Sequence, residues 1–116
     1  MSPFTILAEP NRRRLLDALI QGPMTVGELV DQSGMSQPAV SKHLRMLREG
    51  AFVSVEPDGQ KRRYHLNREP FQSIDEWLQP HREFWAERLD ALEQHLADRH
   101  ASSHNKHGDN RGDDYE

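Results

Sequence analysis

Apolar residues recur at helical spacing in three short segments of the first half of the chain, each bounded by residues that start or stop helices. The first segment begins at Pro10, which suits the first turn of a helix, and ends at Gly22–Pro23. The second begins at Thr25 and ends at Gly34. Its Thr25 and Glu28 match a capping box, in which each side chain accepts a hydrogen bond from the other residue's backbone amide.

The third segment follows the second after a very short connection. Ser36 is its predicted N-cap, Pro38 falls in its first turn, and Gly50 ends it. Its core-facing positions, spaced i, i+4 and i+7, are Val40, Leu44 and Leu47. The sequence therefore predicts two consecutive helices separated by a tight turn at Ser33-Gly34-Met35, the layout of a helix-turn-helix.

The hydrophobic period changes after residue 50. Residues 52–55 and 63–66 are typical of strands, and Pro57-Asp58-Gly59 between them is typical of a tight turn. A hairpin that follows two such helices predicts a mainly α fold with a small β-hairpin, the winged helix-turn-helix, with residues 57–63 as the wing.

The last third of the chain is predicted to be one long helical region. It opens at Pro70 and runs to about His100, and Pro80 is expected to kink it or to split it in two. Residues 101–116 are rich in Ser, Asn, Gly, Asp and His without an apolar period, which predicts a disordered tail. We expect a single DNA-binding domain over residues 1–100, with a dimerisation helix at about 70–100.

Composition narrows the class of protein. Apolar residues make up 34% of the 116 positions, against about 45% in an ordinary globular domain, so part of the chain is disordered or a partner completes the core. The absence of cysteine excludes disulfides, thiolate metal sites and a cysteine nucleophile. No apolar run approaches the ~20 residues of a membrane helix, and the N-terminus does not resemble a signal peptide, so we expect a cytoplasmic protein without membrane contact.

The net charge of −4 hides a strong gradient along the chain. Residues 36–68 hold seven basic and three acidic residues, a net charge of +4, whereas residues 71–100 have a net charge of −4. A local basic patch is what a polyanion recognises, so the middle of the chain favours binding to double-stranded DNA.

The outer face of the third helix, residues 36–49, is the predicted reader of base edges. Gln37 suits adenine, Arg45 suits guanine and Ser41 suits either base, while the basic wing suits phosphates or a minor groove. We expect Arg12–Arg14 to pair with local acids such as Glu9 or Asp17. The candidate DNA-binding residues are Thr25, Ser36, Gln37, Pro38, Ala39, Ser41, Lys42, His43, Arg45, Lys61, Arg62 and Arg63.

These motifs resemble the ArsR family of bacterial winged-helix repressors. The similarity covers roughly residues 3–97, and the segment Ser-Gln-Pro-Ala-Val-Ser-Lys-His-Leu at 36–44 is quite specific. The final helix, with Trp77 and Trp85, looks like the branch whose members lack metal-binding cysteines. The resemblance implies a homodimer that binds operator DNA and represses transcription, with an unknown small molecule as a possible effector.

Metal sensing is not expected, because the family's ligand positions are poorly filled. Thr25 and Gly27 stand where metal-sensing members place cysteines, and the final helix offers only His95 and Asp98 as half of the family's second site. A separate cluster of His100, His104 and His107 falls in or next to the predicted tail. We therefore expect no metal and no cofactor, and a metal-responsive repressor that uses these C-terminal histidines is an alternative.

Apolar residues in the final helix follow a heptad-like spacing that favours a homodimer. This spacing assigns Leu78, Arg82, Trp85, Leu89, Leu92 and Leu96 to the dimer interface, and the resemblance to the ArsR family implies that Phe4, Ile6 and Leu7 join them. A winged-helix module that binds other proteins through this acidic helix is a second alternative. The sequence has no Gly-rich phosphate loop, nucleophile elbow or paired catalytic carboxylates, so we do not expect an enzyme.

Overall fold

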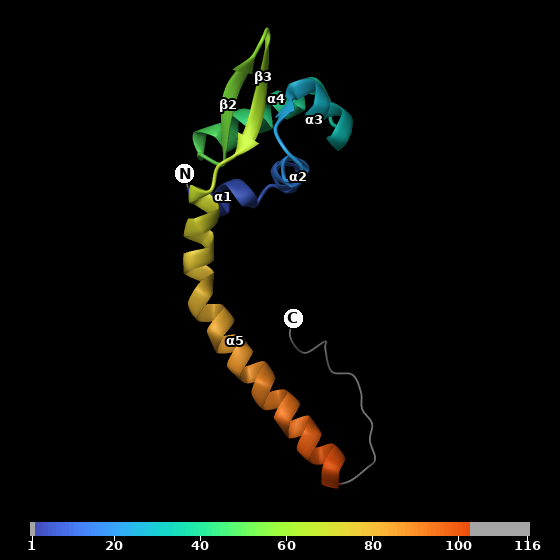
Figure 1. Ribbon diagram of the computed structural model, residues 1–116, viewed down its shortest axis with the longest axis vertical. Coiled ribbons are helices and arrows are strands. Elements are labelled where there is room, and N and C mark those ends of the chain that lie inside the picture. The colour runs from blue at the N-terminus through green and yellow to red at the C-terminus, as the bar shows by residue number, and fades with distance from the viewer. Residues whose placement is uncertain (1, 103–116) are drawn as a thin grey trace. The chain divides into compact units, whose positions relative to one another are not determined.

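The computed structural model describes residues 2–102 (Figure 1). Two compact units divide between Trp77 and Leu78. The first unit contains four helices, α1 (Pro3–Leu7), α2 (Pro10–Leu19), α3 (Val26–Ser33) and α4 (Gln37–Glu49), and a sheet of β1 (Met24–Thr25), β2 (Val53–Asp58) and β3 (Lys61–Leu66). Helix α5 (Glu69–Ser102) begins in the first unit and makes up the described part of the second.

Local signals place the helices where the sequence predicts them. The capping box is present: the Thr25 amide donates to Glu28 Oε1 at 2.9 Å, and the Glu28 amide donates to Thr25 Oγ1 at 3.2 Å. Gly34 ends α3 in the left-handed conformation at φ +75°, which favours glycine. Ser36 Oγ accepts the Ala39 amide at 3.3 Å and so caps α4. The predicted helix-turn-helix is confirmed.

The sheet is larger than predicted. It has three antiparallel strands in the order β1-β3-β2, and β1 pairs Met24 with Tyr64 and Thr25 with Arg63. The wing strands run further than expected. Asp58 of β2 lies opposite Lys61 of β3 in the strand register, so only Gly59 and Gln60 remain in the turn. The turn predicted at residues 57–59 is therefore wrong by about two residues, and the hairpin is longer and tighter.

The core of the first unit gathers apolar residues from all four helices and from the start of β2. The positions predicted from α4 are buried, and Phe52 packs edge-to-face on Phe71 of α5 at 5.1 Å. The buried apolar residues are Ile6, Leu15, Leu16, Leu19, Leu29, Val40, Leu44, Leu47, Phe52 and Val53. The burial of Ile6, with 0% exposure in the single chain, contradicts its predicted place in a dimer interface.

The connection from α4 to β2 contains Ala51, a non-glycine residue at φ +65°. Asn67 holds this connection: its side-chain Nδ2 donates to Ala51 O at 3.0 Å, and its amide donates to Phe52 O at 2.9 Å. Ser54 Oγ in turn donates to Asn67 Oδ1 at 2.8 Å. The hydrogen bonds of Asn67 keep Ala51 in a conformation that costs about 1–2 kcal/mol for an L-residue.

The arginines of α2 bind helix ends rather than acids. Arg12 donates to Ile6 O at 2.8 Å and Arg13 donates to Leu7 O, both near the C-terminus of α1. Arg14 donates to Ser33 O at 2.7 Å, in the last residue of α3. The predicted pairing with Glu9 or Asp17 is wrong: the three guanidinium groups lie at the C-terminal ends of α1 and α3, where unpaired carbonyls attract cations, and Glu9 Oε1 instead accepts the Asn11 amide at 2.6 Å.

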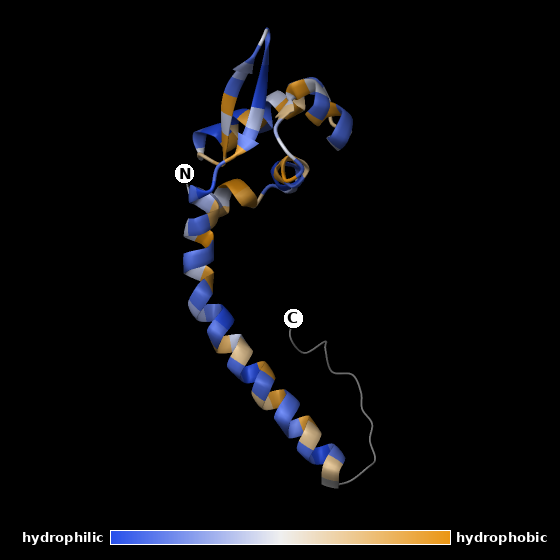
Figure 2. Cartoon of the chain, in the orientation of Figure 1, coloured by the Kyte–Doolittle hydropathy of each residue, from blue (hydrophilic) through white to orange (hydrophobic). Residues whose placement is uncertain are grey.

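Helix α5 is continuous from Glu69 to Ser102, so the predicted split at Pro80 is wrong. It begins one residue before the predicted start, and it includes residues 101 and 102, which were assigned to the tail. Figure 2 shows apolar residues interspersed with hydrophilic ones along its whole length. The rest of the predicted tail, residues 103–116, lies outside the described residues.

Candidate nucleic-acid interface

The outer face of α4 presents the polar residues that the sequence assigns to DNA reading. Gln37, Ser41, Lys42 and Arg45 are exposed, as are the cap Ser36 and Pro38, while Ala39 and His43 are half-buried. The opposite face of the helix is anchored in the core. Helix α4 is therefore fixed along one side and free to approach a groove along the other.

The three basic residues of the wing differ from one another in their surroundings. Lys61 and Arg62 are exposed, and among the described residues neither makes an ion pair. Arg63 is partly buried, and its guanidinium contacts Asp58 at 2.7 Å and Glu28 at 3.4 Å. The hydrogen bond to Asp58, followed by the charge of Glu28, raises the pKa of Arg63.

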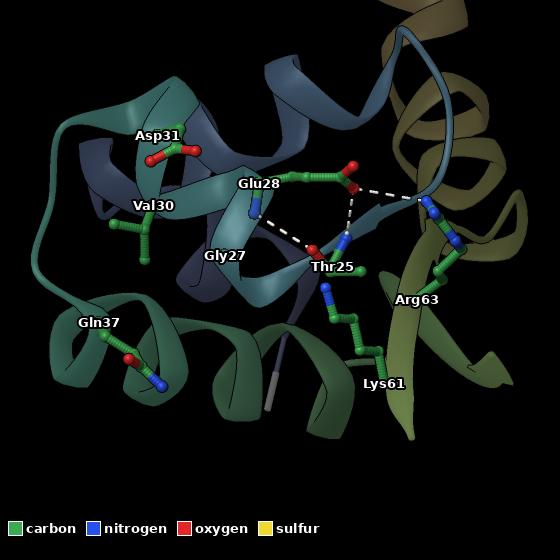
Figure 3. A pocket seen from close by; sticks show the side chains of 8 residues that line it. All are labelled: Thr25, Gly27, Glu28, Val30, Asp31, Gln37, Lys61 and Arg63. Carbon is green, nitrogen blue, oxygen red and sulfur yellow. Dashed lines mark hydrogen bonds and ion pairs between the residues drawn. The ribbon is translucent and has the colours of Figure 1, made fainter. Parts of the chain in front are cut away.

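An open pocket of about 410 Å³ joins the wing to the helix-turn-helix (Figure 3). Its walls come from α3 and the residue before it, from the start of α4 and from β3. Four predicted DNA-binding residues meet there: Thr25, Gln37, Lys61 and Arg63. The structure thus brings the first turn of the predicted reading helix and the first residues of β3 after the wing turn to one hollow on the surface.

Two features of this pocket depart from the predicted site. Thr25 is only 9% exposed and its hydroxyl caps α3, so little of its side chain is available to a phosphate. Glu28 lines the pocket beside the basic residues, although the sequence identifies it only as part of a capping box. Its backbone hydrogen bond from Thr25, together with the charges of Arg63 and Lys61, lowers its pKa.

The predicted dimer residues fall into three groups. Exposed apolar side chains account for most of them: Phe4 is 47% exposed and Trp85 is 49% exposed, and Leu78, Leu89 and Leu96 lie between 37% and 44%. Leu7 and Leu92 are half-buried, and exposed Arg82 donates to Gln79 Oε1 at 2.9 Å. Only Ile6 is wholly buried within this chain, as described above.

Two further aromatic residues widen the exposed apolar surface. Trp77, 55% exposed, packs edge-to-face on Phe4 at 5.5 Å within the first unit. In the second unit Phe84 is 45% exposed and lies edge-to-face on Trp85, with the Arg88 guanidinium 4.2 Å from its ring centre. Both side chains are largely uncovered in the single chain, which the sequence alone does not show.

Residues 2–102 offer neither a metal-binding cluster nor a membrane-spanning helix. This part of the chain holds no cluster of three or more His, Asp or Glu side chains that could bind a metal ion. His100 is exposed, whereas His104 and His107 lie outside the described residues. None of the described helices combines the length and apolarity that a bilayer crossing requires.

Comparison with known proteins is consistent with this geometry. Residues 9–55, which include α2, α3 and α4, match the model of the bacterial regulatory protein, arsR family. The transcriptional repressor SdpR of Bacillus subtilis is 33% identical over 75 residues, which are 65% of this chain and 83% of SdpR. A probable mercury resistance operon repressor of Streptomyces lividans is 44% identical over 63 residues, 54% of this chain and half of that protein.

A solved structure extends the likeness to nearly the whole chain. It is the homodimeric winged helix-turn-helix DNA-binding domain of a possible ArsR-family transcriptional regulator from Mycobacterium bovis, 26% identical with a TM-score of 0.55. The match covers 92% of this chain and 84% of that domain. The chain therefore belongs to the ArsR family of bacterial regulatory proteins, DNA-binding transcriptional regulators with a winged helix-turn-helix fold.

Proposed function

We propose that residues 1–100 form a homodimeric repressor that binds an inverted-repeat DNA operator in the cytoplasm and has no enzymatic activity. The observation that carries this proposal is the pocket at which Gln37 of α4 and Lys61 of the wing meet. A reading helix and a cationic loop on one surface match the two tasks of a specific DNA-binding protein, which are base recognition and phosphate binding.

The exposed side chains of α4 have the chemistry for base recognition. Arg45 suits the two acceptors of guanine in the major groove, and Gln37 suits adenine. Ser41 adds a hydroxyl group that suits either base. Because all three are exposed on a helix whose other side is buried, they approach the bases from a rigid support.

Phosphate binding falls to the exposed cations. Lys61 and Arg62 of the wing and Lys42 of α4 can each neutralise a phosphate and release bound counterions. The start of α4 adds backbone amides that attract anions, with Ser36 and Pro38 at the surface and Ala39 and His43 at the margin. Under this proposal, the affinity for DNA comes mainly from the exposed cations, and the preference for particular bases comes from the side chains of α4.

Exposed apolar side chains support the homodimer. Leu78, Trp85, Leu89 and Leu96 are between 37% and 49% exposed in the single chain, and large exposed apolar patches mark protein–protein interaction sites. The related Mycobacterium bovis domain is homodimeric. A two-fold dimer presents two copies of α4 to successive major grooves about 34 Å apart, and a bound dimer obstructs RNA polymerase.

Selection of bound duplexes from random DNA, with the mass of the complex measured alongside, tests the proposal. The expected result is an inverted repeat bound by two chains, with an affinity that falls by orders of magnitude between about 50 and 200 mM salt. Binding without sequence preference or salt dependence would favour a protein-interaction module instead.

Single substitutions then distinguish the residues that recognise bases from those that bind phosphates. We expect Arg45→Ala to relax preference at one base pair by about 1–3 kcal/mol, and Lys61→Ala to weaken all duplexes alike and to flatten the salt dependence. Arg48→Ala is a matched control, because Arg48 is exposed in the last turn of the same helix, away from the pocket. The assignment fails if Lys61→Ala changes base preference while Arg45→Ala does not.

A further inference from the structure

Arg63 ties the base of the wing to the helix-turn-helix by three contacts. Its Nε donates to Asp58 Oδ2 at 2.7 Å, which joins β3 to β2 across the hairpin. Its Nη1 donates to Pro23 O at 3.3 Å and to Glu28 Oε1 at 3.4 Å, which joins β3 to the segment before α3 and to α3 itself. One guanidinium therefore connects the hairpin to residues 23–28, which lie 35 to 40 positions earlier in the sequence.

The Glu28 atom in this network already has a second task. The same Oε1 that accepts from Arg63 also accepts the Thr25 amide at 2.9 Å, in the capping box of α3 (Figure 3). The capping box fixes the position of the carboxylate on α3. Arg63 binds to that fixed carboxylate, so the wing is held by the first turn of α3.

The surroundings of Arg63 are unfavourable for a phosphate. Two carboxylates lie against its guanidinium, and their side chains are about half exposed, 51% for Glu28 and 53% for Asp58. An approaching phosphate would meet both negative charges, while Lys61 and Arg62 are exposed and form no ion pair within the described residues, although the charge of Lys61 also acts on Glu28. The three wing cations are therefore not equivalent.

We infer that Arg63 is a positioning residue, which holds the wing against the Glu28 carboxylate of α3 so that Lys61 faces the pocket beside Gln37, and that Arg63 does not itself bind DNA phosphate. The inference rests on the proposed function, since it assigns a role within the same interface. It reassigns one of the residues that the basic wing pattern places on the DNA.

Two charge-removing substitutions in the full chain test it, Arg63→Gln and Glu28→Gln. Gln at position 28 keeps the capping hydrogen bond from Thr25 and removes only the charge. The probe is a duplex of about 30 base pairs recovered by selection with the wild-type protein, long enough for two half-sites. We expect each substitution to weaken binding about five- to tenfold without changing the salt dependence, and the double variant to bind no worse than Arg63→Gln alone.

A direct contact between Arg63 and a phosphate predicts a different result for each substitution. Arg63→Gln would then reduce the slope of log affinity against log salt by about 1 per protomer, and Glu28→Gln would tighten binding, since it removes a negative charge near the backbone. Either result overturns the inference. Arg62→Gln is the matched control, a neighbouring wing cation that we do expect to lower the slope.

Hydrogen exchange of the wing amides without DNA separates this inference from the proposed function. We expect both Arg63→Gln and Glu28→Gln to speed exchange between residues 53 and 66, while Arg62→Gln leaves it unchanged. If the wild-type protein binds no duplex, the proposed function fails, and the exchange data still decide whether Arg63 holds the wing. If hydrogen exchange of the wing is unchanged in both variants, Arg63 does not hold the wing against α3.

Discussion

The exposed leucines of α5 allow a quantitative test of the proposed dimer. Leu89 is 44% exposed and Leu96 is 41% exposed in the single chain. Full burial of a leucine side chain contributes about 1.5–3 kcal/mol, so covering the exposed part of either residue contributes about 1 kcal/mol. Because a two-fold axis repeats every substitution, Leu89→Ala should weaken the dimer by about 2 kcal/mol, roughly 30-fold in its dissociation constant.

Sedimentation equilibrium over a range of protein concentrations measures this effect directly. The double variant Leu89→Ala/Leu96→Ala should lose about 4 kcal/mol if the two sites act independently. Ile20→Ala is the control, because Ile20 is 72% exposed, equally apolar and located next to α2 rather than on α5. The reasoning is refuted if the double variant dimerises as tightly as the wild type, or if Ile20→Ala weakens the dimer to the same extent.

Substitutions at three positions test the fold and its coupling to the interface. Ala51→Gly should stabilise the protein by up to about 1 kcal/mol in urea unfolding, because the relief of a left-handed alanine exceeds the added chain entropy of glycine; a loss of stability would contradict this. Ser36→Ala should cost about 1 kcal/mol of stability, because it removes the cap of α4. Ser36→Asp should keep the cap and the stability but weaken DNA binding, because it places a negative charge at the start of α4. If Ser36→Asp binds DNA with the wild-type affinity, Ser36 does not lie in the interface. Glu28 has a pKa below its ordinary value of 4.5 in the folded chain, so its charged form adds stability above that pH, and this is lost as the pH falls through the lowered pKa. Glu28→Gln should therefore flatten the acid side of a plot of unfolding free energy against pH, and an unchanged plot would show that the Glu28 contacts do not stabilise the fold.

Much of the fold could be predicted because its signals are local. A capping box, a left-handed glycine and a serine cap each act within about four residues, so they can be recognised in the sequence. The first two fix the ends of α3, and the third fixes the start of α4. The two-residue strand β1 could not be predicted in this way. It exists because Met24 and Thr25 pair with β3, about 40 residues further along the chain.

The site was predictable in composition but not in detail. The charge pattern correctly indicated a basic wing, yet it could not show that Arg63 faces Glu28, a residue 35 positions away. Nor could it show that Arg12 and Arg14 bind carbonyl groups, because a list of charges says nothing about unpaired backbone groups. Ile6 was assigned to an interface because of the family resemblance, and a resemblance does not show which apolar side chains of this particular chain fill its own core.

The two-residue turn of the wing determines on which face of the hairpin each side chain of β3 lies. Side chains alternate along a strand, so Lys61 and Arg63 leave β3 on one face and Arg62 leaves it on the other. An odd number of residues gained or lost between the turn and Arg63 would exchange these faces and direct Arg63 away from α3, whereas an even number would preserve them. Length variation in this wing, in evolution or in engineering, should therefore proceed in steps of two.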